Sequence, residues 1–79
     1  MKMDIRNLIH MANQIGEFFE AMPDREEALL GIADHLHNFW EPRMRSQLLD
    51  YVDAENGKDL KPIVLSAIRA HRGKLVLQH

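Results

Sequence analysis

Residues 5–23 read IRNLIHMANQIGEFFEAMP, and this stretch decides how the chain begins to fold. Its apolar residues recur at alternating intervals of three and four, the spacing that places side chains on one face of an α-helix. Asp4 is a suitable N-cap, and Pro23 disfavours helical geometry at the residue before it. We therefore predict a first helix over residues 4–22. Its inward stripe consists of Ile5, Leu8, Ala12, Ile15, Phe19 and Met22.

Two further helices follow, and a proline marks each corner. Asp24 and Glu27 have the spacing of an N-terminal capping box, which predicts a second helix over residues 25–40. Pro42 suits the first turn of a third helix over residues 42–54, and Asn56-Gly57 marks a turn within a loop over 55–59. The inward residues are expected to be Leu29, Ile32, Leu36 and Phe39 in the second helix, and Met44, Leu48, Tyr51 and Val52 in the third.

The remaining residues predict a fourth helix and a short tail. Asp59 is its expected N-cap, Pro62 fits its first turn, and Gly73 is its expected end. We expect the tail, residues 73–79, to be flexible, strand-like or docked. The predicted fold is all-α: one domain over residues 1–79, built as a compact bundle of three to four helices with proline-punctuated corners and a core from about residues 4–72. Short connections favour antiparallel neighbours.

The composition excludes several classes of protein. A domain of 79 residues buries only about 60% of the surface that its unfolded chain exposes, so its own core supplies little net stability. The absence of cysteine excludes a disulfide, a thiolate zinc site and an iron–sulfur cluster in this chain. No apolar run has the length of a signal peptide or a membrane span, so we expect a cytoplasmic protein with no membrane partner.

Candidate catalytic and metal-binding residues are few. His35 and His37 are two residues apart, so on a helix they point about 200° apart and do not chelate one ion. The four glycines are scattered and form no phosphate-binding loop. We therefore predict no catalytic, cofactor-binding or metal site in this chain. A small helix-turn-helix nucleic-acid-binding or regulatory protein is the alternative, although the net charge of −2 argues against a nucleic-acid partner.

Residues 37–45, HNFWEPRMR, combine the residue types that protein interfaces favour. Trp, Arg and Met are enriched at interfaces, and Trp and Arg among the residues that dominate binding energy. The same residues also suit a helix corner, with Trp40 in the core and with Arg43 and Arg45 paired to Glu41 or Asp24. From the residues alone, both interpretations stay open.

Two motifs in this order resemble a known family. MANQI at residues 11–15 precedes paired phenylalanines and a proline, and a histidine precedes FWEPRMR at residues 39–45. Over about residues 5–70 this combination is similar to the small delta subunit of cytoplasmic NAD-dependent formate dehydrogenases, enzymes that use molybdenum or tungsten. The matching residues are Met11, Ala12, Asn13, Gln14, Ile15, Phe18, Phe19, Pro23, His35, Phe39, Trp40, Glu41, Pro42, Arg43, Met44 and Arg45.

The resemblance implies a non-catalytic accessory subunit. Such a chain supports assembly, stability or molybdenum-cofactor loading of the catalytic (alpha) subunit, while other subunits hold bis-molybdopterin guanine dinucleotide, iron–sulfur clusters and FMN. The expected partner interface consists of Asn13, Gln14, Trp40, Glu41, Pro42, Arg43, Met44 and Arg45. We also expect self-association of the isolated chain, because Met11, Phe18, Leu30 and Leu49 lie off the main stripes and are expected to expose apolar surface.

Overall fold

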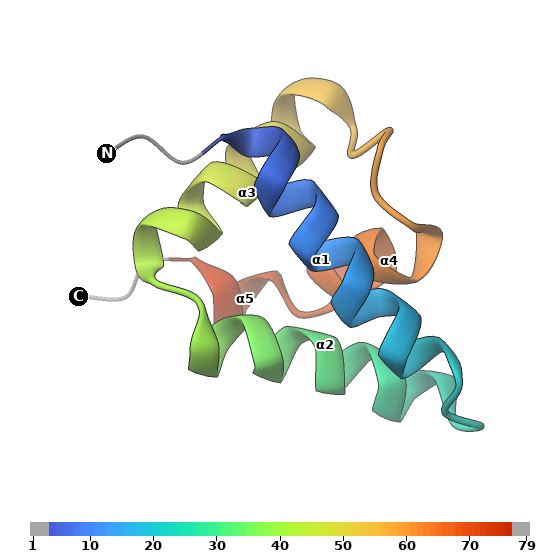
Figure 1. Ribbon diagram of the computed structural model, residues 1–79. Helices are drawn as coiled ribbons and strands as arrows, with labels where there is room; N and C mark the ends of the chain where they lie inside the picture. The colour runs from blue at the N-terminus through green and yellow to red at the C-terminus, as the bar shows by residue number, and fades with distance from the viewer. Residues whose placement is uncertain (1–3, 77–79) are drawn as a thin grey trace.

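The computed structural model describes residues 4–76, which form five helices and no strand within that range. The helices are α1 (Ile5–Glu20), α2 (Arg25–Phe39), α3 (Pro42–Glu55), α4 (Pro62–Ala70) and the short α5 (Arg72–Leu75). The all-α prediction is confirmed. Figure 1 shows α1 and α2 running in opposite directions, as expected of antiparallel neighbours. In contrast, α3 turns upward at the end of α2 and packs against α1 and α5.

The local sequence explains where the helices begin. The Asp4 carboxylate accepts a hydrogen bond from the main-chain N–H two residues on, at 2.9 Å, and Asp24 accepts one from the N–H three residues on, at 3.2 Å. Both predicted N-caps are confirmed. Pro42 and Pro62 each occupy the first turn of a helix, where a missing N–H removes no hydrogen bond. The turn at Asn56-Gly57 is also present, with φ angles of 60° and 64°.

Three of the predicted boundaries are wrong by more than one residue. The first helix ends at Glu20 instead of residue 22, because the proline after Met22 disfavours helical geometry there and the chain closes in a tighter turn. Asp59 does not cap α4; Lys61 holds the N-cap position without a side-chain cap. Gly73 does not end α4, since the chain already leaves helical geometry at residue 71 and Gly73 lies inside α5.

The core lies where α1, α2 and α4 meet, with α3 and α5 closing its sides. Gly16 and Gly31 allow this close approach, because a Cβ on Gly16 would collide with Val64 of α4 and one on Gly31 with the Phe19 ring. Leu49 was expected to be exposed but is only 6% exposed, since α3 presents two adjacent leucines to the core. The fully buried large side chains are Leu8, Ile32, Leu36, Leu48, Val64, Ile68 and Leu75.

The C-terminal segment is docked on the bundle as far as it is described. Leu75 is buried in the core, which therefore extends beyond residue 72. Arg72 donates two hydrogen bonds to the Asp53 carboxylate, at 3.1 and 2.8 Å, and the Lys74 ammonium lies 3.1 Å from Asp34. Part of the tail thus forms α5 against α2 and α3. Residues 77–79 of the predicted tail lie outside the described residues.

Candidate partner interface

The corner between α2 and α3 is built around Trp40. This residue is the C-cap of α2, and its extended backbone (φ −91°, ψ 140°) turns the chain toward α3. The indole is only 6% exposed and packs in the core. Glu41 follows as the N-cap of α3, without a capping hydrogen bond from its side chain, and Pro42 fixes the first helical turn. The sequence left Trp40 between core and interface, and the structure places it in the core.

Arg45 closes this corner from within the chain. Its Nη1 donates to the carbonyl of His37 at 2.7 Å and to the carbonyl of Trp40 at 3.1 Å. Both carbonyls lie at the C-terminal end of α2, where main-chain oxygens lack helical partners and the helix dipole favours a cation. None of the ion pairs within residues 4–76 involves Arg43 or Arg45, so the suggested pairing with Glu41 or Asp24 is absent there. For Arg45, these contacts support the corner interpretation.

The burial of Phe39 is the clearest difference between the sequence prediction and the structure. Phe39 was expected in the core, yet its side chain is 74% exposed. It lies in the last turn of α2, and the turn at Trp40 brings the indole into the core in its place. The Phe39 ring instead contacts the His35 ring, with centroids 4.8 Å apart. Next along the chain, Glu41, Pro42 and Arg43 are all exposed, so the outer side of the corner carries an aromatic ring and an exposed guanidinium.

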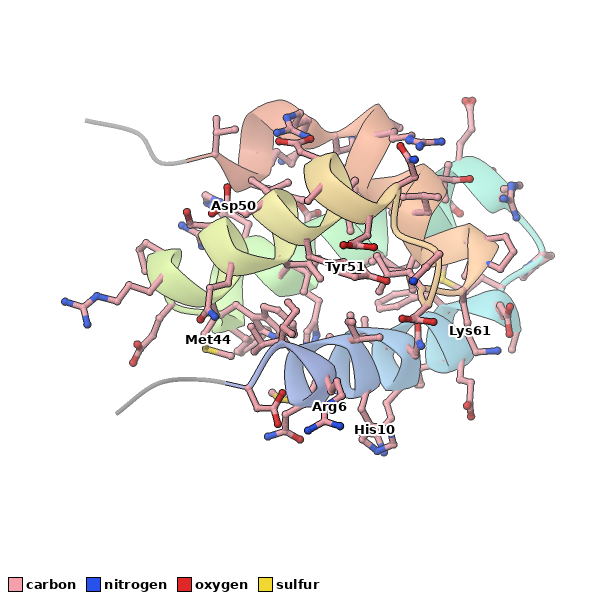
Figure 2. The ribbon with its side chains drawn as sticks, turned by 90° about the horizontal axis from the view of Figure 1, so that it is seen from above. Arg6, His10, Met44, Asp50, Tyr51 and Lys61 are labelled. Atoms are coloured by element: carbon pink, nitrogen blue, oxygen red, sulfur yellow. The ribbon has the colours of Figure 1, made fainter. Side chains whose placement is uncertain are left out.

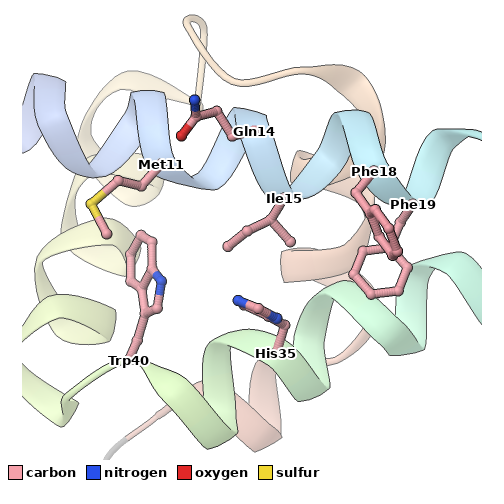
Figure 3. Close-up of a pocket in the computed structure, with 7 residues that line it drawn as sticks. All are labelled: Met11, Gln14, Ile15, Phe18, Phe19, His35 and Trp40. Atoms are coloured by element: carbon pink, nitrogen blue, oxygen red, sulfur yellow. The ribbon is translucent and has the colours of Figure 1, made fainter.

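An apolar groove lies beside this corner, between α1 and α2 (Figure 3). It has a volume of about 450 Å³. In Figure 3 the Met11 side chain approaches the Trp40 indole at one end, and the two phenylalanine rings stand at the other. Phe18 is 73% exposed there. The residues that line this α1–α2 groove are Met11, Gln14, Ile15, Phe18, Phe19, His35 and Trp40.

Asn13 and Gln14 have different surroundings although they are adjacent in the sequence. Asn13 holds the loop before α4: its Nδ2 donates to the Asp59 carbonyl at 3.0 Å, and its Oδ1 accepts from the Lys61 N–H at 2.8 Å. The Tyr51 hydroxyl accepts from the Asp59 N–H at 2.8 Å and holds the same loop. Gln14 is exposed at the edge of the α1–α2 groove. Asn13 therefore uses its amide to hold that loop, whereas the Gln14 side chain is exposed.

A known protein family matches most of this chain, including the corner and the α1–α2 groove. The family model described as NADH-dependent formate dehydrogenase delta subunit (FdsD) matches residues 7–68. The chain belongs to this family. Comparisons with curated proteins and with solved structures found no match. The matched residues of the delta-subunit chain include α1, α2 and α3 almost entirely, and with them the corner and the α1–α2 groove.

Other kinds of site are not evident in the described part of the delta-subunit chain. No group of three His, Asp or Glu side chains within residues 4–76 is placed to hold a metal ion. The backbone N–H of Arg6 holds the pKa of the Asp4 carboxyl below its ordinary value, but this is the N-cap of α1. Among the described residues, no helix is long and apolar enough to cross a membrane.

The eight residues that the sequence suggested for a partner interface are only partly at the surface. Of the eight residues expected there, Gln14, Glu41, Pro42 and Arg43 are exposed, and Met44 is half-buried. Sequence reasoning missed Phe39 as a surface residue, and it did not foresee the α1–α2 groove. A signal for the groove was present, because Met11 and Phe18 widen the apolar stripe of α1 beyond what one core needs.

Proposed function

We propose that this delta-subunit chain is a non-catalytic accessory subunit of a cytoplasmic formate dehydrogenase complex, and that it docks on the catalytic (alpha) subunit. The observation that carries this proposal is the family match over residues 7–68. The exposed rings of Phe39 and Phe18 support it, because large apolar side chains exposed on a small domain are candidates for contact with another protein. The cofactors of the complex are expected in its other subunits.

The docking surface that we propose is the outer side of the α2–α3 corner. Phe39 supplies an exposed aromatic ring, the kind of side chain that anchors interfaces when a partner pocket buries it. Arg43 has no hydrogen bond or ion pair within residues 4–76, so its planar guanidinium is available for a carboxylate of the partner. Pro42 fixes the backbone between them and limits the entropy lost on binding.

Docking on the catalytic subunit is by itself sufficient for an accessory role in molybdenum-cofactor loading. A partner that binds only the cofactor-competent conformation of the catalytic subunit raises the population of that conformation by mass action. Such a partner needs no cofactor site of its own. Assembly, stability and molybdenum-cofactor loading then differ only in which step of maturation depends on that conformation.

Co-expression of the formate dehydrogenase subunits with variants of this chain tests the proposal. Phe39→Ser and Arg43→Ala remove the two exposed groups of the corner, and Arg69→Ala removes an exposed guanidinium on α4 as the matched control. We expect the first two changes to reduce co-purification with the catalytic subunit and to lower its molybdenum content, and the control to change neither. Equal recovery and equal molybdenum content for all three variants would overturn the proposed docking surface.

A further inference from the structure

The α1–α2 groove carries a second stripe on α1, separate from the stripe that forms the core. Met11, Gln14 and Phe18 follow one another at intervals of three and four residues. Gln14 and Phe18 are exposed, and Met11 is half-buried against the groove. Within residues 4–76, no helix lies across the groove in Figure 3. The stripe therefore resembles one side of a helix–helix interface whose other side is missing.

The charges beside this stripe indicate what covers it. His10 and Glu17 are both exposed on α1, and neither has a hydrogen bond or ion pair within residues 4–76. Figure 2 shows His10 projecting from α1 away from the bundle. The basic group precedes Gln14 and the acidic group follows it. Such a helix complements its own reversed copy, because antiparallel packing places each imidazole beside the other copy's carboxylate.

The register follows from helix geometry. On α1, His10 lies four residues before Gln14 and Glu17 lies three after it. At about 1.5 Å per residue, a two-fold axis at Gln14 therefore brings His10 of one copy to within about 1.5 Å, along the helix, of Glu17 of the other. The same axis sets Phe18 beside the second copy's Met11. Because Met11 lines the groove next to Trp40, Phe18 then enters the groove of the other copy.

Gln14 itself suits a two-fold axis. A primary amide contains both donors and an acceptor, so two symmetry-related glutamines are able to hydrogen-bond to each other reciprocally. One polar residue at the centre of an apolar stripe also selects a single register, because any other register buries its amide without a partner.

We propose that the isolated chain forms a two-fold symmetric homodimer, in which α1 packs antiparallel on α1 of the second copy with Gln14 on the axis. Each copy inserts Phe18 into the α1–α2 groove of the other, and His10 of each lies beside Glu17 of the other. This inference does not rest on the proposed function. It concerns the chain alone, so its test and the co-expression test fail independently.

Site-specific cross-linking tests the geometry, because the chain has no cysteine of its own. In Gln14→Cys the two thiols meet across the axis, and mild oxidation is expected to convert most of the protein into a disulfide-linked dimer. Asp50→Cys, on the exposed side of α3, is the matched control and is expected to stay uncross-linked. Equal cross-linking of the two variants, or none in either, would overturn the proposed axis.

Sedimentation equilibrium tests the contacts. Phe18→Ser is expected to raise the dimer dissociation constant at least about tenfold, because two phenylalanines lose their buried position. His10→Glu sets like charges opposite one another, and Glu17→Lys removes the carboxylate that lies beside the imidazole, so each is expected to weaken the dimer, whereas the double variant places opposite charges side by side and restores it. Circular dichroism checks that each variant stays folded. A strictly monomeric wild-type chain, or a double variant no tighter than the weaker single variant, would refute the proposal.

Discussion

Replacing Arg45 with alanine tests whether this residue holds the α2–α3 corner. The change removes two hydrogen bonds from a guanidinium to main-chain carbonyls, at 2.7 and 3.1 Å. Hydrogen bonds from charged groups contribute about 1.5–3 kcal/mol each, and partial solvent exposure lowers this. We therefore expect Arg45→Ala to reduce the free energy of unfolding by about 2 kcal/mol. For a domain of this size that corresponds to a Tm lower by roughly 8–16 °C.

Thermal unfolding followed by circular dichroism measures this change, and Arg43→Ala is the matched control. Arg43 is exposed and has no polar contact within residues 4–76, so its replacement is expected to change the unfolding free energy by less than about 0.5 kcal/mol. Arg45→Lys should lie between the two, since one ammonium cannot reproduce the planar fork that reaches both carbonyls. Equal Tm values for the Arg43 and Arg45 variants would show that Arg45 does not hold the corner.

Three other changes test separate contacts of the fold. Asn13→Ala removes the amide that holds the loop before α4 and should lower the unfolding free energy by about 1–3 kcal/mol in urea denaturation, whereas Asn38→Ala, at an exposed position of α2, should leave it nearly unchanged. Leu75→Ala should cost about 2–4 kcal/mol in the same assay if α5 is docked as described; a loss near zero would contradict that docking. The Asp4 carboxyl should titrate by NMR below its ordinary pKa of 3.8. Its stabilisation of α1 is therefore present above the unfolded-state pKa and lost as the pH falls through the lowered pKa. An unshifted NMR midpoint would contradict its role as the N-cap of α1.

Much of the fold was predictable because its signals are local. The stripe of α1, the caps Asp4 and Asp24, and the prolines at the first turns of α3 and α4 each act within a few residues. One error arose where a distant part of the chain intervenes. Asp59 had a plausible position for capping α4, but Asn13 of α1 binds the Lys61 N–H there, a contact that no local pattern reveals.

The candidate site was less predictable for a related reason. Helical periodicity places Phe39 on the inward face of α2, but it does not show that the chain turns at the next residue and brings Trp40 into the core. Arg43 and Arg45 are the same residue type two positions apart. Only the fold shows that one contacts the end of α2 while the other is exposed.

We propose that this chain supports the catalytic subunit of a formate dehydrogenase without catalysing the reaction itself. The most direct measurement is the molybdenum content per catalytic subunit, purified from otherwise identical cells with and without this chain. We predict a clearly lower molybdenum content, with correspondingly lower formate oxidation, when the chain is absent. The same molybdenum content and the same yield of assembled complex in both preparations would contradict this proposal.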